Sequence, residues 1–466
     1  MMDGRSFELK DELRQHQLRK IIFLVASLVV LIFFLLWGIS VGSSVLSMRD
    51  VINTLLGKGD KVSEQIVYFI RMPRVLAAVA TGAALSLSGA VIQTVIRNPL
   101  GSPFTLGLSA ASAFGAAFAI VTLGALGGGV APQFGELSQM PWVVTLSAFL
   151  FGLFCALLIT GFARWRGATP EILVMAGIIL TSLFQSGTSL LQYLSTDVEL
   201  ASVISWMFGD LAKATWNKVV IQVLVIFPST VFFVFNAFNF NALNAGDEVA
   251  RSLGVNVDRL RLLAVVVASL CAAVATAFFG IIAFVGLVVP HVTRWLVGYN
   301  DRIVLISSVI LGGIFLLLAD IISRSIIAPV VIPVGIVTSF VGAPFFLFLL
   351  AALIILSKEY KEVIWPSLLG IILLIIGIAG TLECFSPKAK KGGWLGFLSV
   401  WPLEKIFGFL VTQIIFWAAI LAGIVIFWKL LSQALKEAGV IVEIEEKEEE
   451  EKESFIKKFF EDKEPD

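Results

Sequence analysis

Charged residues, histidine and cysteine are scarce in this sequence. Asp, Glu, Lys and Arg make up 15% of the 466 residues, below the share of about a quarter that is usual in soluble domains. The only histidines are His16 and His291, which argues against a metal or haem site built from histidine. Cys155, Cys271 and Cys384 are far apart and form no CxxC pair, so neither a disulfide framework nor a zinc-binding pattern is indicated.

Motifs for nucleotide binding and for metalloprotease chemistry are also absent. The sequence has no G-x-x-x-x-G-K-[ST] loop and no H-E-x-x-H pair. Its formal net charge of zero gives no electrostatic footprint for nucleic acid. We therefore expect no enzyme site, no cofactor, no metal site and no nucleic-acid partner. An ATP-driven activity would need a separate chain to hold the nucleotide.

Apolar residues dominate the sequence. Hydrophobic residues make up 58% of the chain, and the mean hydropathy is +0.95. Apolar runs of about 20 residues, each able to cross roughly 30 Å of hydrocarbon, recur from end to end. Because a spanning backbone must satisfy its own hydrogen bonds, the pattern predicts an all-α protein with many transmembrane helices. The first run, Ile21 to Val41, has no cleavage site and is expected to remain as a span.

The charges around these runs predict a topology. Arg14, Arg19 and Lys20 before the first span place the N-terminus in the cytoplasm. Most segments that then fall inside are rich in Arg or Lys, whereas the outer segment 49–74 carries several bases against this rule. About ten core spans are expected, at residues 21–41, 74–95, 105–126, 142–163, 171–193, 217–238, 262–283, 284–298, 303–323 and 333–356.

The second span carries a stripe of small residues at helical spacing. Gly82, Ser86, Gly89 and Gln93 share one face of this helix. Small residues let another backbone come close, which is how helices associate in lipid. We expect the Gln93 amide to point into protein or a water-filled path rather than into lipid.

Several motifs in a fixed order resemble those of one transporter family. They include RMPRVLAAVATGAALSLSGAVIQTVIRNPLGSPFTLGLSAASAFGA, WMFGDL, NALNAGDEVARSLGV and FVGLVVPHVTRWLVG. The order resembles the FecCD-like permeases of type II ABC importers for ferric siderophores, haem and cobalamin, and the resemblance covers Ile21 to Ser357. It implies a homodimer of ten-helix subunits in a prokaryotic plasma (inner) membrane. It also implies two cytoplasmic ABC ATPase subunits and an extracytoplasmic substrate-binding protein as partners.

The resemblance favours import of a metal chelate, with a ferric siderophore as the preferred cargo and cobalamin or haem as alternatives. The sequence itself does not decide which chelate is carried. From another class, an ion-coupled secondary transporter is the alternative. It would need acids or bases in mid-span, and the expected spans hold almost none.

The expected organisation has four parts. A cytoplasmic N-terminal segment, 1–20, precedes a permease core, 21–357. An additional transmembrane hairpin, 358–432, contains apolar runs at about Val363 to Leu382 and Ile406 to Leu431. An acidic tail, 433–466, follows. An even number of added spans returns this tail to the cytoplasm, where a regulatory role stays open.

The polar turn after the second span is a candidate gate. Pro99 removes a backbone donor, and Pro103 suits a helix start, so a purely structural turn is one interpretation. The resemblance implies that Asn98 and Leu100 help to form the cytoplasmic gate. It also points to a second gate at Thr169 and Pro170, where the local match to the family is weaker.

The arginines of the outer face are candidates for docking the binding protein. The resemblance implies that Arg71, Arg74 and Arg324 pair with its carboxylates, a task that suits the planar guanidinium fork. Helix anchoring at the headgroups is the alternative for Arg71 and Arg74, and an ion pair with Asp320 is the alternative for Arg324. Val331 stands where the family commonly has an acid, so the surface chemistry there is open.

Two further sets of residues follow from the resemblance. The inner segment NALNAGDEVARSLGV is expected to contact the ATPase through short coupling helices, although a solvated loop is the alternative. The fifth span is expected to line the pathway, although its hydroxyls could bond their own backbone instead. The coupling set is Asn244, Gly246, Asp247, Glu248, Arg251 and Gly254, and the pathway set is Ser182, Gln185, Ser186 and Thr188.

Overall fold

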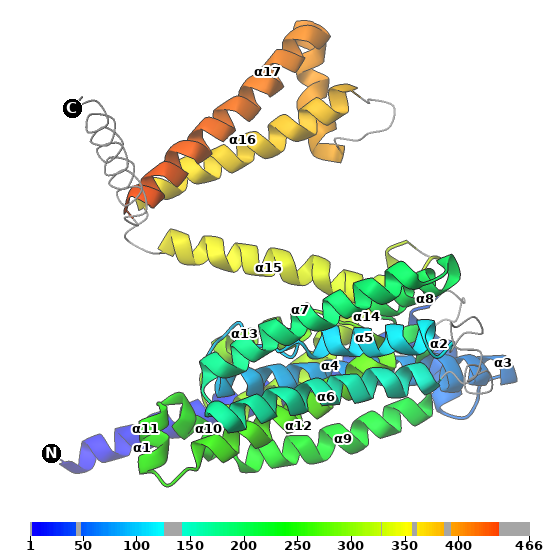
Figure 1. The fold of residues 1–466 in the computed structure, drawn as a ribbon, viewed down its shortest axis with the longest axis vertical. Coiled ribbons are helices and arrows are strands. Elements are labelled where there is room, and N and C mark those ends of the chain that lie inside the picture. The colour runs from blue at the N-terminus through cyan, green and yellow to red at the C-terminus, as the bar shows by residue number, and fades with distance from the viewer. Residues whose placement is uncertain are drawn as a thin grey trace, which may run out of the picture. The chain divides into compact units, whose positions relative to one another are not determined.

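A computed structural model describes residues 2–42, 48–124, 142–327, 329–356, 361–385 and 393–437. Within these ranges every regular element is a helix (Figure 1). The chain divides into two compact units, Met1–Phe345 and Phe346–Asp466. Most of the predicted acidic tail lies outside the described residues.

The first unit confirms the expected membrane architecture. Each of the predicted core spans coincides with a helix, although the helix ends differ from the prediction by several residues. Among the described residues, 7 helices are long and apolar enough to cross a membrane. The helices are α1 (Met2–Ser40), α2 (Met48–Leu55), α3 (Lys61–Gln65), α4 (Met72–Val95), α5 (Leu108–Val121), α6 (Trp142–Arg166), α7 (Pro170–Leu194), α8 (Asp197–Met207), α9 (Trp216–Phe235), α10 (Ala237–Asn244), α11 (Asp247–Ser252), α12 (Val257–Phe279), α13 (Val285–Val297), α14 (Asp301–Ser325) and α15 (Val334–Leu356).

Helix α4 is the most buried of the spans. It packs against α9, α12, α13 and α14, and almost all of its residues after Arg74 are buried. A Cβ atom on Gly82 would lie 2.1 Å from the carbonyl oxygen of Gly312 in α14, and one on Gly89 would lie 1.8 Å from that of Gly286 in α13. The small-residue stripe therefore brings two neighbouring backbones into direct contact with α4.

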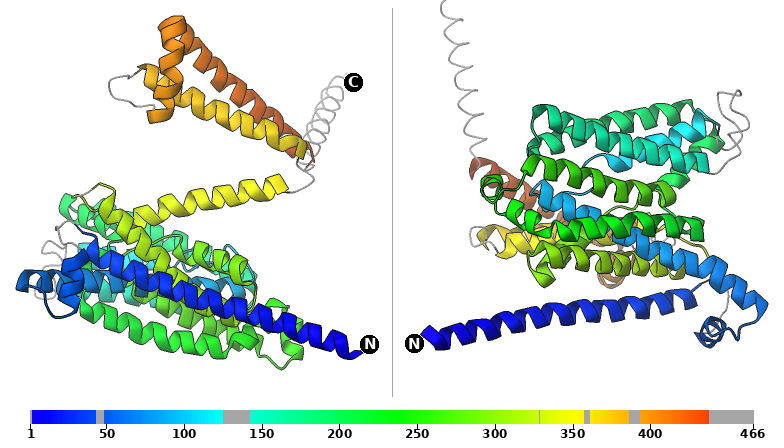
Figure 2. Two further views of the ribbon diagram at one scale, coloured as in Figure 1. Left: turned by 180° about the vertical axis from the view of Figure 1, so that it is seen from behind. Right: turned by 90° about the horizontal axis from the view of Figure 1, so that it is seen from below.

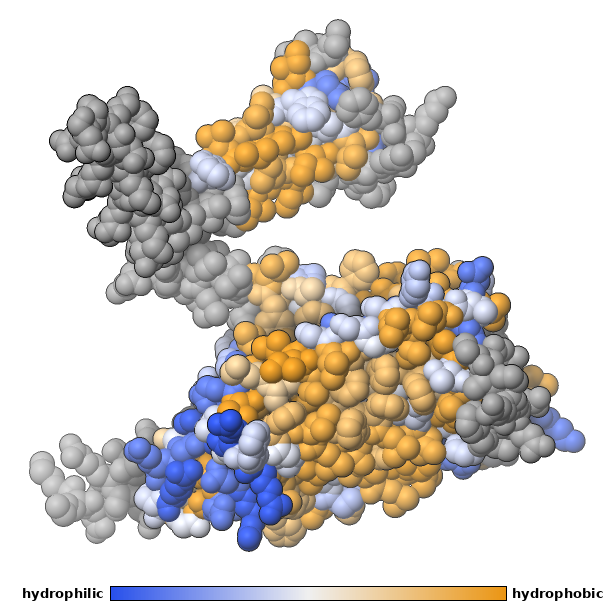
Figure 3. Space-filling model, viewed as in Figure 1, coloured by the Kyte–Doolittle hydropathy of each residue, from blue (hydrophilic) through white to orange (hydrophobic). Residues whose placement is uncertain are grey.

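The two ends of this helix bundle are polar. Helices α10 and α11 lie at one end, together with the N-terminal end of α1, and α2, α3 and α8 lie at the other (Figures 1 and 2). Between these ends the surface is a broad apolar band (Figure 3). We call the two ends the α11 end and the α8 end. This distribution is typical of a bundle whose middle faces lipid.

Helix α8 was not predicted from the sequence. Its start is fixed by a capping box, in which the Thr196 hydroxyl accepts from the Glu199 backbone while the Glu199 carboxylate accepts from the Thr196 backbone. The T-x-x-E spacing is the signal that could have located it. The helix turns the chain back toward α9 after α7.

The second unit consists of the end of α15 together with α16 (Lys361–Phe385) and α17 (Gly393–Glu437). Helices α16 and α17 pack against each other along small residues, including Gly380 beside the ring of Phe416. The predicted second run was too short, because α17 begins at Gly393 and continues through Pro402. The segment 393–405, predicted to be a loop, is therefore helical.

Candidate functional site at the α11 end

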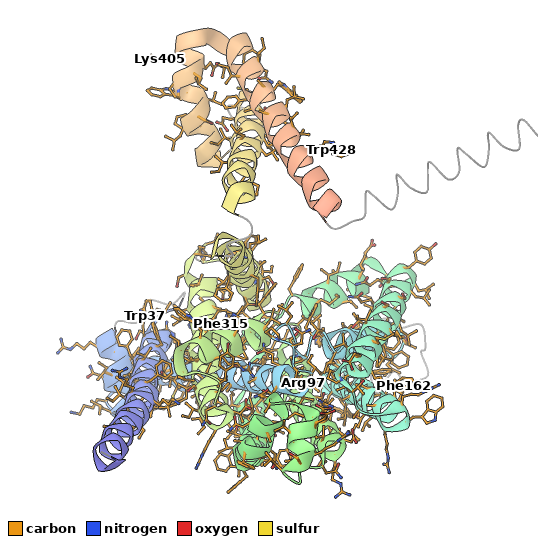
Figure 4. All side chains as sticks on the ribbon, turned by 90° about the vertical axis from the view of Figure 1, so that its left-hand side faces the viewer. Trp37, Arg97, Phe162, Phe315, Lys405 and Trp428 are labelled. Atoms are coloured by element: carbon orange, nitrogen blue, oxygen red, sulfur yellow. The ribbon has the colours of Figure 1, made fainter. Side chains whose placement is uncertain are left out.

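The turn that follows α4 is held by its own hydrogen bonds. The side chain of Asn98 accepts from the backbone nitrogen of Leu100 at 2.9 Å, and the carbonyl of Asn98 accepts from Gly101 at 2.9 Å. Arg97 has a φ of 48°, which is uncommon for a residue with a side chain. Figure 4, which looks onto this end, shows Arg97 near the centre of the bundle, with Trp37 and Phe162 near opposite edges. Asn98 and Leu100 are exposed.

The second predicted gate turn starts α7. Thr169 is its N-cap, with the hydroxyl accepting from the backbone of Ile172 at 3.5 Å, and Pro170 occupies the first turn. The start of α7 therefore explains both residues without a role in gating. Ala168, the preceding residue, is buried. The gate roles of both turns stay predictions.

Arg261 connects these two turns to α11. Its side chain, 1% exposed, donates to the carbonyl of Val95 at the end of α4 and to the carbonyl of Ala168, both at 3.0 Å. The same guanidinium group holds the Asp247 carboxylate with two hydrogen bonds of 2.7 and 2.8 Å. Arg261 was not among the predicted site residues. Its signal in the sequence was a second arginine, two residues after Arg259, on the apolar side of the first turns of α12.

Asp247, the first residue of α11, also forms an ion pair with a second arginine. The guanidinium of Arg97 lies 3.3 Å from its carboxylate, and both side chains are partly exposed. The hydrogen bonds from Arg261 hold the pKa of Asp247 below its ordinary value. A lowered pKa stabilises the fold at pH values above the ordinary Asp range. This contribution is lost only as the pH falls through the lowered pKa, so the Asp247 carboxylate stays charged at neutral pH.

A second polar network joins α10 to α4. The Asp301 carboxylate accepts from Asn244 at 2.7 Å and from the hydroxyl of Thr94 at 3.1 Å. Arg294 of α13 donates to Thr94 at 2.9 Å and also to the side chain of Gln93. Gln93 therefore points into protein, as predicted. The network fixes the last turn of α4 against α10, α13 and α14.

A cavity of about 590 Å³ opens beside this network. Its lining includes Arg97, Asn98, Asn244 and His291. The ring of His291 packs edge-on against Phe345, with 6.5 Å between ring centroids. This contact gives His291 a packing role in the bundle. The cavity borders both the first gate turn and the start of the coupling segment.

The rest of the predicted coupling segment forms the surface of this end. Gly246 and Gly254 bracket α11 with φ values of 120° and 82°, conformations that favour glycine. Glu248 and Arg251 are exposed. The ion pair of 3.6 Å between Arg251 and Asp258 is exposed, and exposed pairs of this kind contribute little stability. Contact of this surface with an ATPase stays a prediction.

Three of the predicted pathway residues, Ser182, Gln185 and Thr188, line two adjoining cavities on α7. The first, about 360 Å³, is lined by Leu100 of the gate turn and Ser182, and the second, about 330 Å³, by Gln185 and Thr188. Both cavities share Phe104 as a lining residue. The geometry thus brings the first gate turn and the α7 residues onto one face.

The hydroxyl groups on this face mostly bond their own helix. Ser182 donates to the carbonyl of Ile178 at 3.1 Å, and Thr188 donates to that of Phe184 at 2.8 Å. Ser186 is exposed and lines neither cavity. The hydroxyl groups of Ser182 and Thr188 therefore bond the backbone of their own helix, which is the alternative to a pathway role. Their roles in a pathway stay predictions.

The outer arginines lie at the α8 end and are turned inward. Arg71, which is 4% exposed, donates to the carbonyls of Ile39 and Ser40 at 2.7 and 2.8 Å. Arg324 donates to Gly38 at 3.2 Å and also to Val41. These bonds satisfy the carbonyls at the C-terminal end of α1, where cations are stabilising.

Asp320 completes this arrangement. Its buried carboxylate lies 2.9 Å from the guanidinium of Arg74 and 3.0 Å from that of Arg324. The ion pair between Asp320 and Arg324 within α14, predicted as the alternative to docking, is therefore present. Arg74 of α4 contacts the same carboxylate. Docking by the three arginines stays a prediction, because each already has acceptors within this chain. Val331, at the same end, is exposed.

Comparison with known proteins identifies relatives over most of the first unit. The profile of the FecCD transport family matches residues 30–352. A protein of Methanocaldococcus jannaschii that is assigned as an ABC transporter permease is 43% identical over 345 residues, which is 74% of this chain and 97% of the relative. The hemin transport system permease HmuU of Yersinia pestis is 33% identical over 69% of this chain and 93% of its own length.

A solved structure supports the same fold. An inward-facing conformation assigned to the metal-chelate type of ABC transporter aligns with a TM-score of 0.60 at 30% identity. The alignment covers 70% of this chain and 97% of that chain. The part of this chain beyond the family match, including α16 and α17, therefore has no counterpart within that profile.

Proposed function

The chain belongs to the FecCD transport family and is a multi-pass permease of the ABC importers for metal chelates, and from this premise we propose that it imports a ferric siderophore. It works as a homodimer in a prokaryotic plasma membrane. Two cytoplasmic ATPase subunits drive it, and an extracytoplasmic binding protein delivers the chelate. The ATPase site is on the partner, because this sequence has no nucleotide-binding loop.

The observation that carries the proposal is that the predicted gate turn, the α7 cavities and the predicted coupling helix α11 are directly connected in the fold. The exposed turn at Asn98 and Leu100 borders the α7 cavities, and α11 is bonded to the end of α4 through Arg261. A force applied at α11 can therefore reach the turn that borders the pathway. The predicted gate, pathway and coupling roles are the functional interpretation of this arrangement.

The orientation follows from the bases at the α11 end. Arg164 and Arg166 close α6 there, and Arg97, Arg251 and Arg259 belong to neighbouring turns and helices of the same end. Segments rich in Arg and Lys remain on the cytoplasmic side. We therefore assign the α11 end, and with it the N-terminus, to the cytoplasm.

Relatives that are about equally similar to this chain in sequence are named for different cargoes. Sequence identity alone therefore does not show which cargo this chain carries. A Bacillus subtilis relative named for Fe(3+)-citrate is 33% identical, and a Halobacterium salinarum relative named for cobalamin is 36% identical. The cavities along α7 offer neutral groups, chiefly Gln185 and Ser182. Neutral donors can hydrogen-bond the oxygen-rich surface of a ferric siderophore without the strong binding that would prevent release.

A cargo panel tests this proposal. The permease, reconstituted with its ATPase and its binding protein, is given radiolabelled ferrichrome, Fe(3+)-citrate, hemin and cobalamin in parallel. We expect ferrichrome to accumulate fastest and to compete with the others. Preferential accumulation of hemin or cobalamin would keep the importer class and contradict the siderophore assignment.

Truncation tests whether the added hairpin belongs to the transport mechanism. We expect a chain ending at Lys361 to dimerise, bind its ATPase and transport chelate at a rate close to the full chain, because the family match ends at residue 352. A chain ending at Glu437 is the control that removes only the tail. Loss of uptake in a Lys361 truncation that still assembles would show that α16 and α17 contribute to transport.

A further inference from the structure

We infer that Arg261 is the positioning residue that makes both predicted gate turns move with α11. The inference rests on the proposed function, since it assumes that α11 is displaced by the ATPase. It concerns one buried side chain rather than the coupling surface as a whole. That side chain contacts three segments that are far apart in the sequence.

The geometry makes Arg261 a junction. Its Nε donates to Val95, the last residue of α4, and one terminal nitrogen donates to Ala168, just before α7. Both terminal nitrogens then hold Asp247 at the start of α11. A displacement of α11 therefore acts, through one rigid planar group, on the ends of both gate turns.

Only arginine can make this set of contacts. The guanidinium group has five N–H donors in a fixed plane, and here they serve two carbonyls and two carboxylate oxygens. Lysine would keep the charge, but its three donors sit on a single nitrogen and cannot span these positions. The substitution Arg261→Lys therefore removes the geometry while it preserves the charge.

Burial distinguishes this junction from the neighbouring ion pairs. The Arg261 side chain is 1% exposed, whereas those of Arg97 and Arg251, in the pairs nearby, are 39% and 59% exposed. A buried charge-assisted hydrogen bond is stronger and more rigid than a solvated one. Arg97 can release Asp247 to water at little cost, but Arg261 cannot.

The backbone at Gly246, which joins α10 to α11, supports the same inference. α10 is tied through Asn244 to Asp301, so it is fixed to α14 and α4. α11 begins after Gly246, whose φ of 120° is open to rotation without side-chain clashes. The arrangement allows α11 to tilt about Gly246, and Arg261 is the contact that transfers this tilt to the gate turns.

The test compares Arg261→Lys with Arg259→Lys, an exposed arginine in the same turns of α12. Each variant is assembled with its ATPase and binding protein in proteoliposomes, and ferrichrome uptake and ATP hydrolysis are measured in the same sample. We expect Arg261→Lys to hydrolyse ATP but to lower uptake per ATP by about tenfold, the scale of one charge-assisted hydrogen bond. Arg259→Lys is expected to match the wild type.

A second variant and a second readout make the test independent of folding and of cargo. Asp247→Asn keeps the side-chain shape, and it should lower uptake per ATP in the same direction. Spin labels at Thr169 and Ser252 report whether the gate turn follows α11 when a non-hydrolysable ATP analogue binds. The distance between the labels should be unchanged by the analogue in the wild type, because the two segments move together, and should change in Arg261→Lys.

The outcomes separate the two claims. Absence of ATP-dependent ferrichrome uptake by the wild type would count against the proposed function, while the labels would still decide the role of Arg261. Equal uptake per ATP in Arg261→Lys and Arg259→Lys would overturn the inference. So would a label distance in Arg261→Lys that stays constant when the analogue binds.

Discussion

Replacing Asp320 by alanine is expected to destabilise the folded chain by about 3–5 kcal/mol, the cost of breaking a buried ion pair from one side. Asp320 has a side-chain exposure of 0%, and it contacts the guanidinium groups of Arg74 and Arg324. Its removal leaves two inward-facing cations without a carboxylate. Thermal unfolding of the purified permease in detergent, followed by size-exclusion chromatography, measures the loss.

Asp258→Ala is the matched control for this prediction. Asp258 also pairs with an arginine, but both side chains are more than half exposed, so its removal should cost about 0–1 kcal/mol. A similar unfolding temperature for Asp320→Ala and Asp258→Ala would contradict the structural role of the buried group.

The variant Asp320→Asn also bears on docking at the α8 end. If Arg74 and Arg324 pair with a binding protein, removal of their internal carboxylate should strengthen that association at low salt. If their role is confined to packing and to α1, association should be unchanged or weaker. Binding of the chelate-loaded binding protein to permease in nanodiscs, measured at two salt concentrations, distinguishes these results.

Replacing Gly89 by alanine is expected to prevent the normal packing of α4. A Cβ atom at this position would lie 1.8 Å from the carbonyl oxygen of Gly286, far inside van der Waals contact. Because both atoms belong to or adjoin rigid helical backbone, α4 and α13 must separate. Overpacking of this kind costs about 1–3 kcal/mol and occasionally more, so we expect low yield and a strongly lowered unfolding temperature.

Gly161→Ala in α6 is the control, because a Cβ atom there meets nothing within 4 Å. This substitution should leave yield and unfolding temperature unchanged or slightly raised, since alanine favours helix over glycine. An unfolding temperature for Gly89→Ala that equals that of the control would show that α4 and α13 do not approach as closely as described.

The spans could be predicted because their signal is local. A run of apolar residues reports membrane crossing without reference to other parts of the chain, and the small-residue stripe on α4 reports close packing. α8 was missed because it is only 11 residues long, too short to be recognised as a span, and a capping box alone, here at Thr196 and Glu199, is weak evidence for a helix. The start of α17 was missed because Pro402, Glu404 and Lys405 interrupt the apolar run from which this span was predicted.

The site could be predicted only in part, because its bonds join distant segments. Arg74 and Asp320 are 246 residues apart, and no sequence pattern shows that they meet. The resemblance to importers directed attention to the exposed residues of α11 and to Asn98. It did not reveal Arg261, whose importance depends on the positions of Val95, Ala168 and Asp247 in the folded chain.

The most direct test of the importer assignment is the energy source for uptake. Proteoliposomes that contain the permease and its ATPase receive chelate-loaded binding protein on the side of the α8 end and ATP on the side of the α11 end. We predict accumulation of chelate with ATP and none with a proton or sodium gradient alone. Equal accumulation driven by an ion gradient, without ATPase or ATP, would contradict the assignment of this chain as an ATP-driven importer.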